Sequence, residues 1–304
     1  MLQGRGALPP RSGTIETSPV SAPTPPPHGA APDPAMEQAR LEELLHPAAT
    51  ADVPFYGRLV RVATAEVLEL GCGGGRLTLP LADVGATITG VDNDPAALAV
   101  LAEKLRDRPA LARRTTLLLQ DLRTLALGPR FGLVIVPSNN LQLFPTAPLR
   151  AAVLRTVVSH LLPQGRAAID VTYPDLDEEL MGQWLLQSER AHPSGGTARQ
   201  LVRVQRRGTT ADQQWDVSYR FEHHRTDGSV QTFGRDHVLG YFYPEQGRAE
   251  MEAAGLEVRH IHGDYGGTAP SGAGQPRQLY ELRLPTATRE AALSAATPRL
   301  GGGR

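Results

Sequence analysis

The sequence is short of several features that would define common functions. Its 304 residues include one cysteine, Cys72, so no disulfide can form within the chain and a cysteine zinc cluster is not expected. No apolar run approaches the roughly 18 residues of a membrane span. The 31 basic and 32 acidic residues leave a formal net charge of −1, which gives no general attraction to nucleic acid or an anionic membrane. These features favour a cytoplasmic protein with neither membrane nor nucleic acid as a partner.

The two ends of the chain differ in composition from its middle. Residues 1–34 contain nine prolines and many small residues, and such a segment buries too little apolar surface to offset its chain entropy. It is predicted to be disordered and lacks the apolar core of a secretory signal. A helical pattern begins at Met36, which is also a candidate start codon. Residues 35–285 are predicted to form one domain, and 286–304 a flexible tail.

Four glycines follow a short apolar segment early in this domain. Residues 67–70, Val-Leu-Glu-Leu, predict a buried strand, and 71–75, Gly-Cys-Gly-Gly-Gly, predict a tight turn. Residues 76–84 then resume with helical spacing. Such a strand, turn and helix bring bare backbone and a helix N-terminus together, where a nucleotide-like ligand can approach.

The spacing of the glycines separates two kinds of nucleotide site. The dinucleotide pattern G-x-G-x-x-G needs a third glycine where this chain has Arg76 or, in the second register, Thr78. What remains is Glu69 followed by glycines at alternate positions. A carboxylate beside such a turn suits a ligand that has a cationic amino group and no phosphate. The pattern therefore disfavours an NAD oxidoreductase.

A second carboxylate supports a nucleoside site. Asp92 ends another predicted strand, 85–92, about 20 residues after the first glycine, where an acidic side chain can meet the ribose hydroxyls. This holds for adenosylmethionine and for NAD alike. Asp92 has the alternative role of capping the next helix, although Asp94 before Pro95 is the stronger N-cap signal.

These motifs resemble those of the class I S-adenosylmethionine-dependent methyltransferases, of the small-molecule type similar to methyltransferase domain 25. The resemblance covers about residues 50–285, including the segments Asp121-Leu122 and Pro137-Ser138-Asn139 after the third and fourth predicted strands. It implies a Rossmann-like α/β fold, with a seven-stranded, mostly parallel sheet covered by helices on both faces. It also implies S-adenosyl-L-methionine as the cofactor.

The resemblance assigns cofactor contacts to positions in this chain. Glu69 is expected near the amino-acid end, Asp92 at the ribose, and Asp121 beside the adenine. Tyr56 is a candidate cover for the cofactor, with packing of its helix onto the sheet as an equal alternative. The complete set of implied cofactor residues is Tyr56, Glu69, Gly71, Cys72, Gly73, Arg76, Asp92, Asn93, Asp121, Leu122, Pro137 and Ser138.

The pattern changes after residue 171. Segments 200–207, 213–225 and 229–241 alternate with period two, and Asp227-Gly228 predicts a two-residue hairpin turn. The result is a predicted three-stranded antiparallel insert at about 199–241. Its stripe Trp215, Val217, Tyr219 and Phe221 fits a wall of the acceptor site, packing on the core, or the face of a homodimer.

Methyl transfer from a sulfonium depends mainly on alignment of the nucleophile and exclusion of water. Asn139 lies where the resemblance implies that side chains face the transferable methyl, and its amide can orient an amine or a hydroxyl or cap a short helix. His262 is the candidate base. His237 falls in the polar-face register of the insert and is expected to face solvent. No set of carboxylates or histidines has metal-ligand spacing, so no metal is expected.

The sequence thus predicts a methyltransferase that acts on nitrogen or oxygen of a small-molecule acceptor. One alternative is a protein or nucleic-acid methyltransferase, for which the clustered Arg199, Arg203, Arg206 and Arg207 are the only hint. Another is a non-catalytic protein that uses the cofactor pocket as a scaffold.

Overall fold

The computed structural model describes residues 33–46, 51–63, 66–128, 130–172, 178–209, 212–269 and 277–289. The predicted disordered segment 1–34 lies outside these ranges except for its last two residues. Most of the predicted flexible tail also lies outside them. Its first four residues, 286–289, are helical, and Arg289 N donates to Pro285 O at 3.0 Å. The flexibility of the tail from residue 286 onward stays a prediction.

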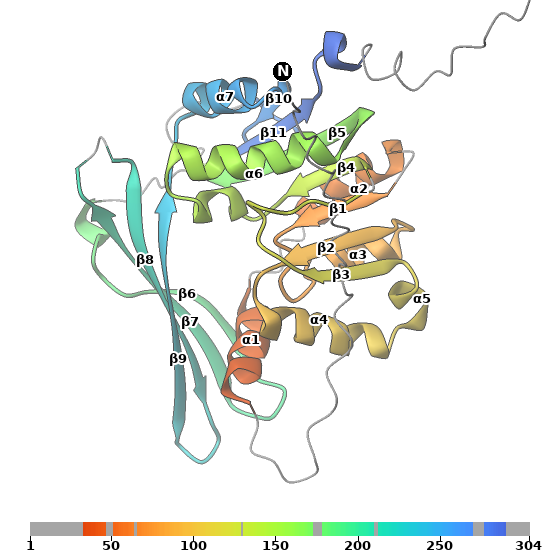
Figure 1. Cartoon of the computed structure of the whole chain (residues 1–304). Coiled ribbons are helices and arrows are strands. Elements are labelled where there is room, and N and C mark those ends of the chain that lie inside the picture. Colours follow the sequence, from red (N-terminus) through yellow and green to blue (C-terminus); the bar gives the residue numbers. More distant parts are fainter. Residues whose placement is uncertain are drawn as a thin grey trace, which may run out of the picture.

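A seven-stranded sheet forms the centre of the molecule, in the order β10-β11-β5-β4-β1-β2-β3 (Figure 1). Only β11 runs antiparallel to its neighbours, β5 and β10. The strands are β1 (Val67–Leu70), β2 (Ile88–Asp92), β3 (Thr115–Leu119), β4 (Phe131–Val136), β5 (Leu161–Thr172), β10 (Glu257–His262) and β11 (Arg277–Arg283). β1 and β4 are buried along their whole length, because the sheet is covered on both faces. The predicted fold class is confirmed.

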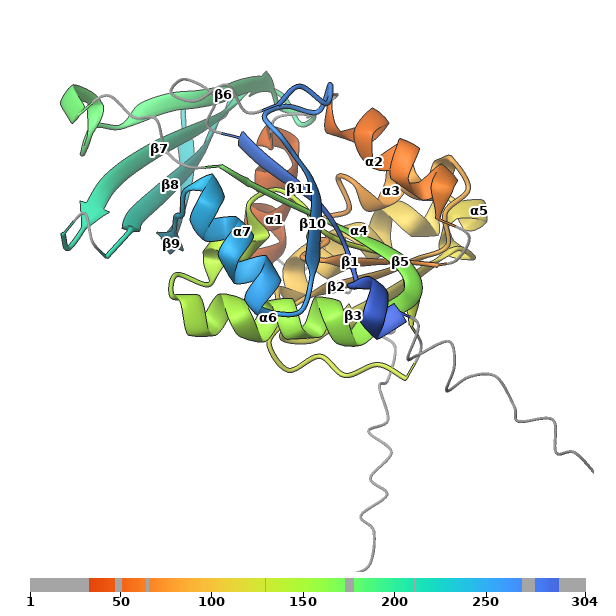
Figure 2. The ribbon, with the colours of Figure 1, turned by 90° about the horizontal axis from the view of Figure 1, so that it is seen from above.

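Helices lie on both faces of this sheet (Figure 2). Helices α2 and α3 pack on one face around Leu133 and Ile135, and α6 and α7 contribute to the core on the other face around Val134 and Val136. The helices and short helical turns are α1 (Pro34–Leu45), α2 (Asp52–Val62), α3 (Thr78–Asp83), α4 (Pro95–Arg106), α5 (Pro109–Ala112), η1 (Asn140–Leu143), α6 (Ala147–His160), η2 (Glu178–Leu180) and α7 (Pro244–Ala253). None of the described helices is long and apolar enough to cross a membrane.

The insert is a separate antiparallel sheet of four strands, in the order β6-β7-β8-β9. These are β6 (Leu185–Ala191), β7 (Thr197–Arg207), β8 (Gln214–His224) and β9 (Val230–Gly240). The sequence prediction of three strands missed β6, whose side chains are largely exposed and show no apolar alternation. The predicted hairpin is present, and Gly228 at its turn has a φ of +87°.

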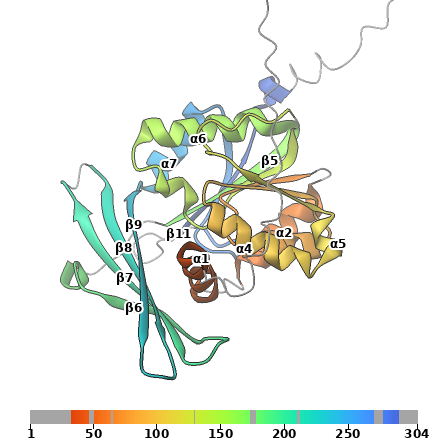
Figure 3. The same ribbon diagram turned by 60° about the horizontal axis from the view of Figure 1, so that its bottom comes forward.

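Helix α1 lies between the insert and α4 (Figure 3). Its Leu41 and Leu45 pack against Ala198 and Phe221 on the inner face of the insert. The predicted stripe on β8 therefore faces inward: Trp215, Val217 and Phe221 are buried. Helix α1 and the insert together close off the carboxyl ends of β1, β2 and β4, where ligands bind in sheets of this kind.

Candidate cofactor and acceptor site

The turn after β1 requires glycine for two reasons. Gly71 has a φ of +84°, a backbone conformation that is unfavourable for residues with a Cβ atom. A Cβ at Gly71 would also lie 2.2 Å from Asn140 Nδ2. In the structure Asn140 Nδ2 instead donates a hydrogen bond of 2.9 Å to the Gly71 carbonyl oxygen. The loop after β4 thus holds the glycine turn in place through Asn140.

Asp92 lies at the end of β2 and holds the same turn from the other side. Its Oδ2 accepts a hydrogen bond from Gly73 N at 2.8 Å, and its Oδ1 accepts from Asp94 N at 2.9 Å. Each carboxylate oxygen has a second lone pair, which leaves Asp92 able to accept from a diol. Burial raises the pKa of Asp92, and these backbone hydrogen bonds oppose that rise. Helix α4 is capped by Asp94, which accepts from Ala96 N and Ala97 N.

Glu69 is buried within β1 with 1% of its surface exposed. Its Oε2 accepts a hydrogen bond of 2.6 Å from Thr78 Oγ1 at the start of α3. Burial raises the pKa of Glu69 to about 8, although the Thr78 hydrogen bond and nearby Arg76 lower it. The charge of Glu69 near neutral pH therefore depends on the polar and charged groups that contact it.

Arg76 links three segments around the turn. Its Nη2 lies 2.7 Å from Asp52 Oδ2 on α2 and donates to Ser138 Oγ at 2.6 Å. The Asp52 contact is a close ion pair that lacks hydrogen-bond geometry, since both Asp52 oxygens are buried and have no hydrogen-bond partner in the described part of the chain. Nη1 of Arg76 also has no partner among the described residues. A buried guanidinium and carboxylate with unused hydrogen-bonding capacity mark a place for a zwitterionic ligand.

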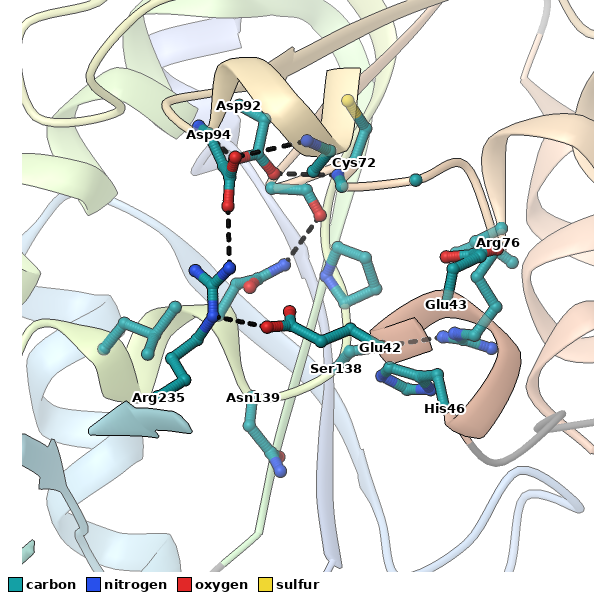
Figure 4. A pocket seen from close by; sticks show the side chains of 18 of the residues that line it. Glu42, Glu43, His46, Cys72, Arg76, Asp92, Asp94, Ser138, Asn139 and Arg235 are labelled. Carbon is teal, nitrogen blue, oxygen red and sulfur yellow. Dashed lines mark hydrogen bonds and ion pairs between the residues drawn. The ribbon is translucent and has the colours of Figure 1, made fainter. Parts of the chain in front are cut away.

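A cavity of about 630 Å³ lies between the glycine turn and the inner face of the insert. This is within the usual size of small-molecule sites. Its lining includes these predicted residues: Glu69, Gly71, Cys72, Gly73, Arg76, Asp92, Asn93, Pro137, Ser138 and Asn139. Figure 4 shows Asp92 and Arg76 on either side of the turn, with Asn139 across the cavity. Asn139 has a φ of +63°, and its buried Oδ1 has no hydrogen-bond partner within the ranges that the structure describes.

Three predicted cofactor residues do not line this cavity. Asp121 forms an ion pair of 2.5 Å with Arg123, which lowers the Asp121 pKa. Leu122 is buried in the core beneath α6. Tyr56 is fully buried and packs edge-on against Phe55, with ring centroids 5.3 Å apart. The position of Tyr56 fits the alternative in which it packs its helix onto the sheet. Burial raises the pKa of Tyr56 well above the ordinary value.

The histidines are arranged differently from the sequence prediction. His262 is not in the cavity lining, and its Nε2 lies 2.9 Å from Glu281 Oε1. This geometry does not favour His262 as a base at the cavity. His237 was expected to face solvent, but it lines the cavity from β9 and packs edge-on against Tyr219. The error arose because polar and apolar residues occur on both faces of β9, so alternation alone could not identify the inner one.

Sequence reasoning also missed several polar residues of the insert that line the cavity, together with their contacts. Arg235 Nε donates to Glu42 Oε1 of α1 at 2.8 Å, and its Nη2 donates to Asp94 Oδ2 at 3.0 Å (Figure 4). Gln200 Nε2 donates to Gln187 Oε1 at 2.7 Å, and both side chains line the cavity. In the structure the strand register pairs Gln200 with Phe221 and Arg235 with Tyr219, both in the apolar stripe of β8.

Comparison with known proteins agrees with this arrangement. Residues 67–165 match the family model described as a methyltransferase domain. This segment of the chain is similar to methyltransferase domains. Over 108 residues it is 34% identical to the cypemycin N-terminal methyltransferase of a Streptomyces species, and this match covers 36% of the chain and 42% of that protein.

Solved structures resemble most of the chain in fold. An S-adenosylmethionine-dependent methyltransferase from Clostridium acetobutylicum superimposes with a TM-score of 0.68 at 16% identity, covering 82% of this chain and 98% of its own. The sugar N-methyltransferase KedS8 from a Streptoalloteichus species gives a TM-score of 0.63 at 20% identity, covering 88% and 100%. At these identities the likeness concerns the fold.

Proposed function

We propose that this protein transfers a methyl group from S-adenosylmethionine to nitrogen or oxygen of a small-molecule acceptor. The observation that carries the proposal is the convergence of the glycine turn, Asp92 and Arg76 on one cavity of a methyltransferase domain. Relatives named as methyltransferases of a sugar nitrogen and of cypemycin support an acceptor of this kind.

The residues around the turn fit the cofactor. Arg76 Nη1, which has no partner among the described residues, can donate to a carboxylate, and Asp52 or Glu69 can accept from an ammonium group. Asp92 can accept from ribose hydroxyls. Because Gly71 and Gly73 have no side chains, the ligand can approach the backbone closely. Asp121 and Leu122 have no assigned role here, since they lie outside the cavity lining.

S-adenosylmethionine supplies a methyl group on a cationic sulfur, and a nucleophile displaces it as the carbon–sulfur bond breaks with its electron pair on sulfur. The protein then has to align the nucleophile and exclude water. Asn139 Oδ1 is buried and has no partner among the residues described, so it is suited to orient an N–H or O–H of the acceptor. Helix α1 and the insert cover the cavity and so reduce its contact with water.

A nucleic-acid acceptor is less well supported. Three of the four arginines that suggested a basic surface are paired with acidic residues: Arg199 with Glu189, Arg206 with Glu178 and Arg207 with Asp216. Arg203 stacks over the Trp184 ring at 4.8 Å. These contacts leave little free positive charge for phosphates.

The proposal is tested by calorimetry with S-adenosylmethionine. We expect binding by the native protein and at least about 30-fold weaker binding by Asp92→Ala, because the variant loses the diol acceptor and a support of the turn. Asp121→Ala is the matched control and should bind normally. Equal affinity of the native protein and Asp92→Ala would remove the site assignment, and no binding by the native protein would remove the proposed cofactor.

A further inference from the structure

Side chains from three different elements hold the backbone of the glycine turn. Asn140 binds it from η1 and Asp92 from the end of β2. The third is Lys104 of α4, whose Nζ donates a hydrogen bond of 2.8 Å to the Gly74 carbonyl oxygen. Asn140 and Asp92 line the cavity, whereas Lys104 does not. Any effect of Lys104 on a ligand in the cavity is therefore indirect and passes through its partners.

Lys104 fixes one peptide group of the turn together with a second contact. The peptide between Gly74 and Gly75 is planar, so its C=O and N–H groups point in opposite directions. Lys104 holds the oxygen, and Gly75 N donates to Cys72 O at 3.0 Å. A turn whose peptide groups are fixed in advance loses less conformational freedom when a ligand binds, and this preorganisation strengthens binding.

The same ammonium group binds α1. Lys104 Nζ lies 2.6 Å from Glu43 Oε1, and both side chains are partly buried. The Glu43 carboxylate lies directly against the turn, because a Cβ added at Gly74 would come within 2.6 Å of Glu43 Oε2. Gly74 thus leaves the space that this carboxylate occupies. Lys104 therefore joins α4, the glycine turn and α1 at one point.

Helix α1 is a wall of the cavity. Ala39, Glu42 and Glu43 line the cavity from this helix, and Figure 4 shows the two glutamates beside it. Glu42 accepts a hydrogen bond from Arg235 of the insert, while Glu43 binds Lys104. Adjacent residues of α1 thus tie it to the insert on one side and to the glycine turn on the other. A ligand bound against the turn would lie beneath α1.

The apolar attachment of α1 is small, so its polar contacts matter for how firmly it stays closed. Three of its twelve residues are buried, and its leucines pack against the insert. Toward α4 it is held by two ion pairs, Glu43 with Lys104 and Arg40 with Glu103. Of these two pairs, the one made by Lys104 also contacts the glycine turn.

We propose that Lys104 and Glu43 form a clasp that couples α1 to the glycine turn, so that closure of α1 and binding of S-adenosylmethionine strengthen each other. Lys104 is then a positioning residue, which acts on the cofactor through Gly74 and Glu43 without touching it. This inference rests on the proposed function and extends its cofactor site to a residue outside the cavity lining.

The coupling can be measured on α1 itself. By linkage, the factor by which saturating S-adenosylmethionine slows the opening of α1 equals the factor by which closed α1 tightens cofactor binding. Opening of the helix exposes its backbone amides, so hydrogen exchange reports it. In the full chain we expect S-adenosylmethionine to slow exchange in residues 34–45 by at least about tenfold.

Lys104→Met removes the ammonium group and keeps a long side chain. Calorimetry should show S-adenosylmethionine binding at least about fivefold more weakly, and the slowing of α1 exchange at saturation should fall to about threefold or less. If Lys104 only stabilised the fold, the variant would have a lower free energy of unfolding but the native slowing factor.

Arg40→Gln is the matched control, because it removes the other ion pair between α1 and α4, which is exposed and does not contact the turn. This variant should speed the exchange of α1 in the free protein. Its affinity for S-adenosylmethionine should stay within about twofold of the native value, and the slowing factor should be native. A loss of affinity as large as that of Lys104→Met would contradict the clasp.

A double-variant cycle tests whether the two residues act as a unit. Glu43→Gln alone should weaken S-adenosylmethionine binding about threefold, and less than about 1.5-fold when Lys104→Met is already present. Fully additive losses would mean that Glu43 acts independently of Lys104, and the clasp would be refuted.

The outcomes separate the clasp from the proposed function. If S-adenosylmethionine does not bind the native chain, the proposed function fails and the clasp fails with it. If it binds without slowing α1 exchange, the clasp is refuted and the cofactor site stands. Should Lys104→Met fail to fold, the exchange measurement on the native chain and on Glu43→Gln still decides, because Glu43→Gln should also reduce the slowing factor.

Discussion

The two sides of the cavity are built on different principles. On the glycine-turn side the contacts are made largely by backbone and by groups fixed to it, such as Asp92 holding Gly73 N. On the insert side the lining consists of side chains that project from an antiparallel sheet, such as Gln200 and His237. The shape of the glycine-turn side depends on the backbone conformation of the turn. The shape of the insert side depends on which side chains stand at the inward-facing strand positions.

This difference indicates how each side tolerates change. A backbone turn with positive φ cannot accept other residues without strain. A strand position can take a different side chain while its hydrogen bonds to neighbouring strands stay intact. Under the proposed function, the rigid side binds the common cofactor and the exchangeable side selects the acceptor.

The sharpest contrast is expected from adding a methyl group to one glycine on each side. Gly71→Ala forces a Cβ to within 2.2 Å of Asn140 Nδ2 at a φ of +84°. We expect a loss of about 4 kcal/mol in the free energy of unfolding, from backbone strain and overpacking together. Denaturant unfolding should reveal this loss.

The control is Gly234→Ala in β9, where the nearest atom to a new Cβ is Tyr219 O at 3.9 Å. It should change stability by less than about 0.5 kcal/mol. Similar losses for both variants would contradict the contrast between the two sides.

A second prediction concerns the buried Glu69 on the rigid side. Because its pKa is raised to about 8 in the folded protein, the folded state retains a proton that the unfolded state releases near pH 4.5. The stabilisation from this group is present below about pH 4.5 and is lost as pH rises through about 8. The native protein should lose on the order of 3 kcal/mol relative to Glu69→Gln across this range. Unfolding curves of the two proteins at pH 5 and pH 8 measure the difference, and parallel pH profiles would contradict it.

A smaller effect is expected where the two sides meet. Arg235→Gln removes the ion pairs from β9 to Glu42 and Asp94, and the Arg235 side chain is one-third exposed. Solvent screening limits the expected loss to about 1 kcal/mol. Hydrogen exchange of α1 should become faster, because Arg235 is one of its ties to the insert. Arg199→Gln, which removes an exposed pair with Glu189 on the outer face, should leave α1 exchange unchanged.

Much of the fold could be predicted because its signals are local. The strand, glycine turn and helix at residues 67–83 follow from apolar runs and glycine spacing, and the Asp227-Gly228 turn located the β8–β9 hairpin. Strand β6 was missed because its exposed sequence carries no alternation and its pairing with β7 is not encoded locally.

The site was predicted only in part for a similar reason. Positions next to strand ends, such as Asp92 and Ser138, reach the cavity because parallel strands share one edge. Asp121 has an equivalent place in the sequence, but its carboxylate pairs with Arg123 instead. The contacts of Arg235 join residues more than 140 positions apart, and no pattern in the sequence indicates them.

The sequence by itself determined the nucleotide-type turn, the alternation of strands and helices, and the presence of an antiparallel insert, because each rests on the chemistry of neighbouring residues. Only the tertiary structure decided that His237 faces the cavity, where α1 lies, and which charges are already paired. These depend on the packing of the insert against the sheet, which brings together side chains that are distant in the chain.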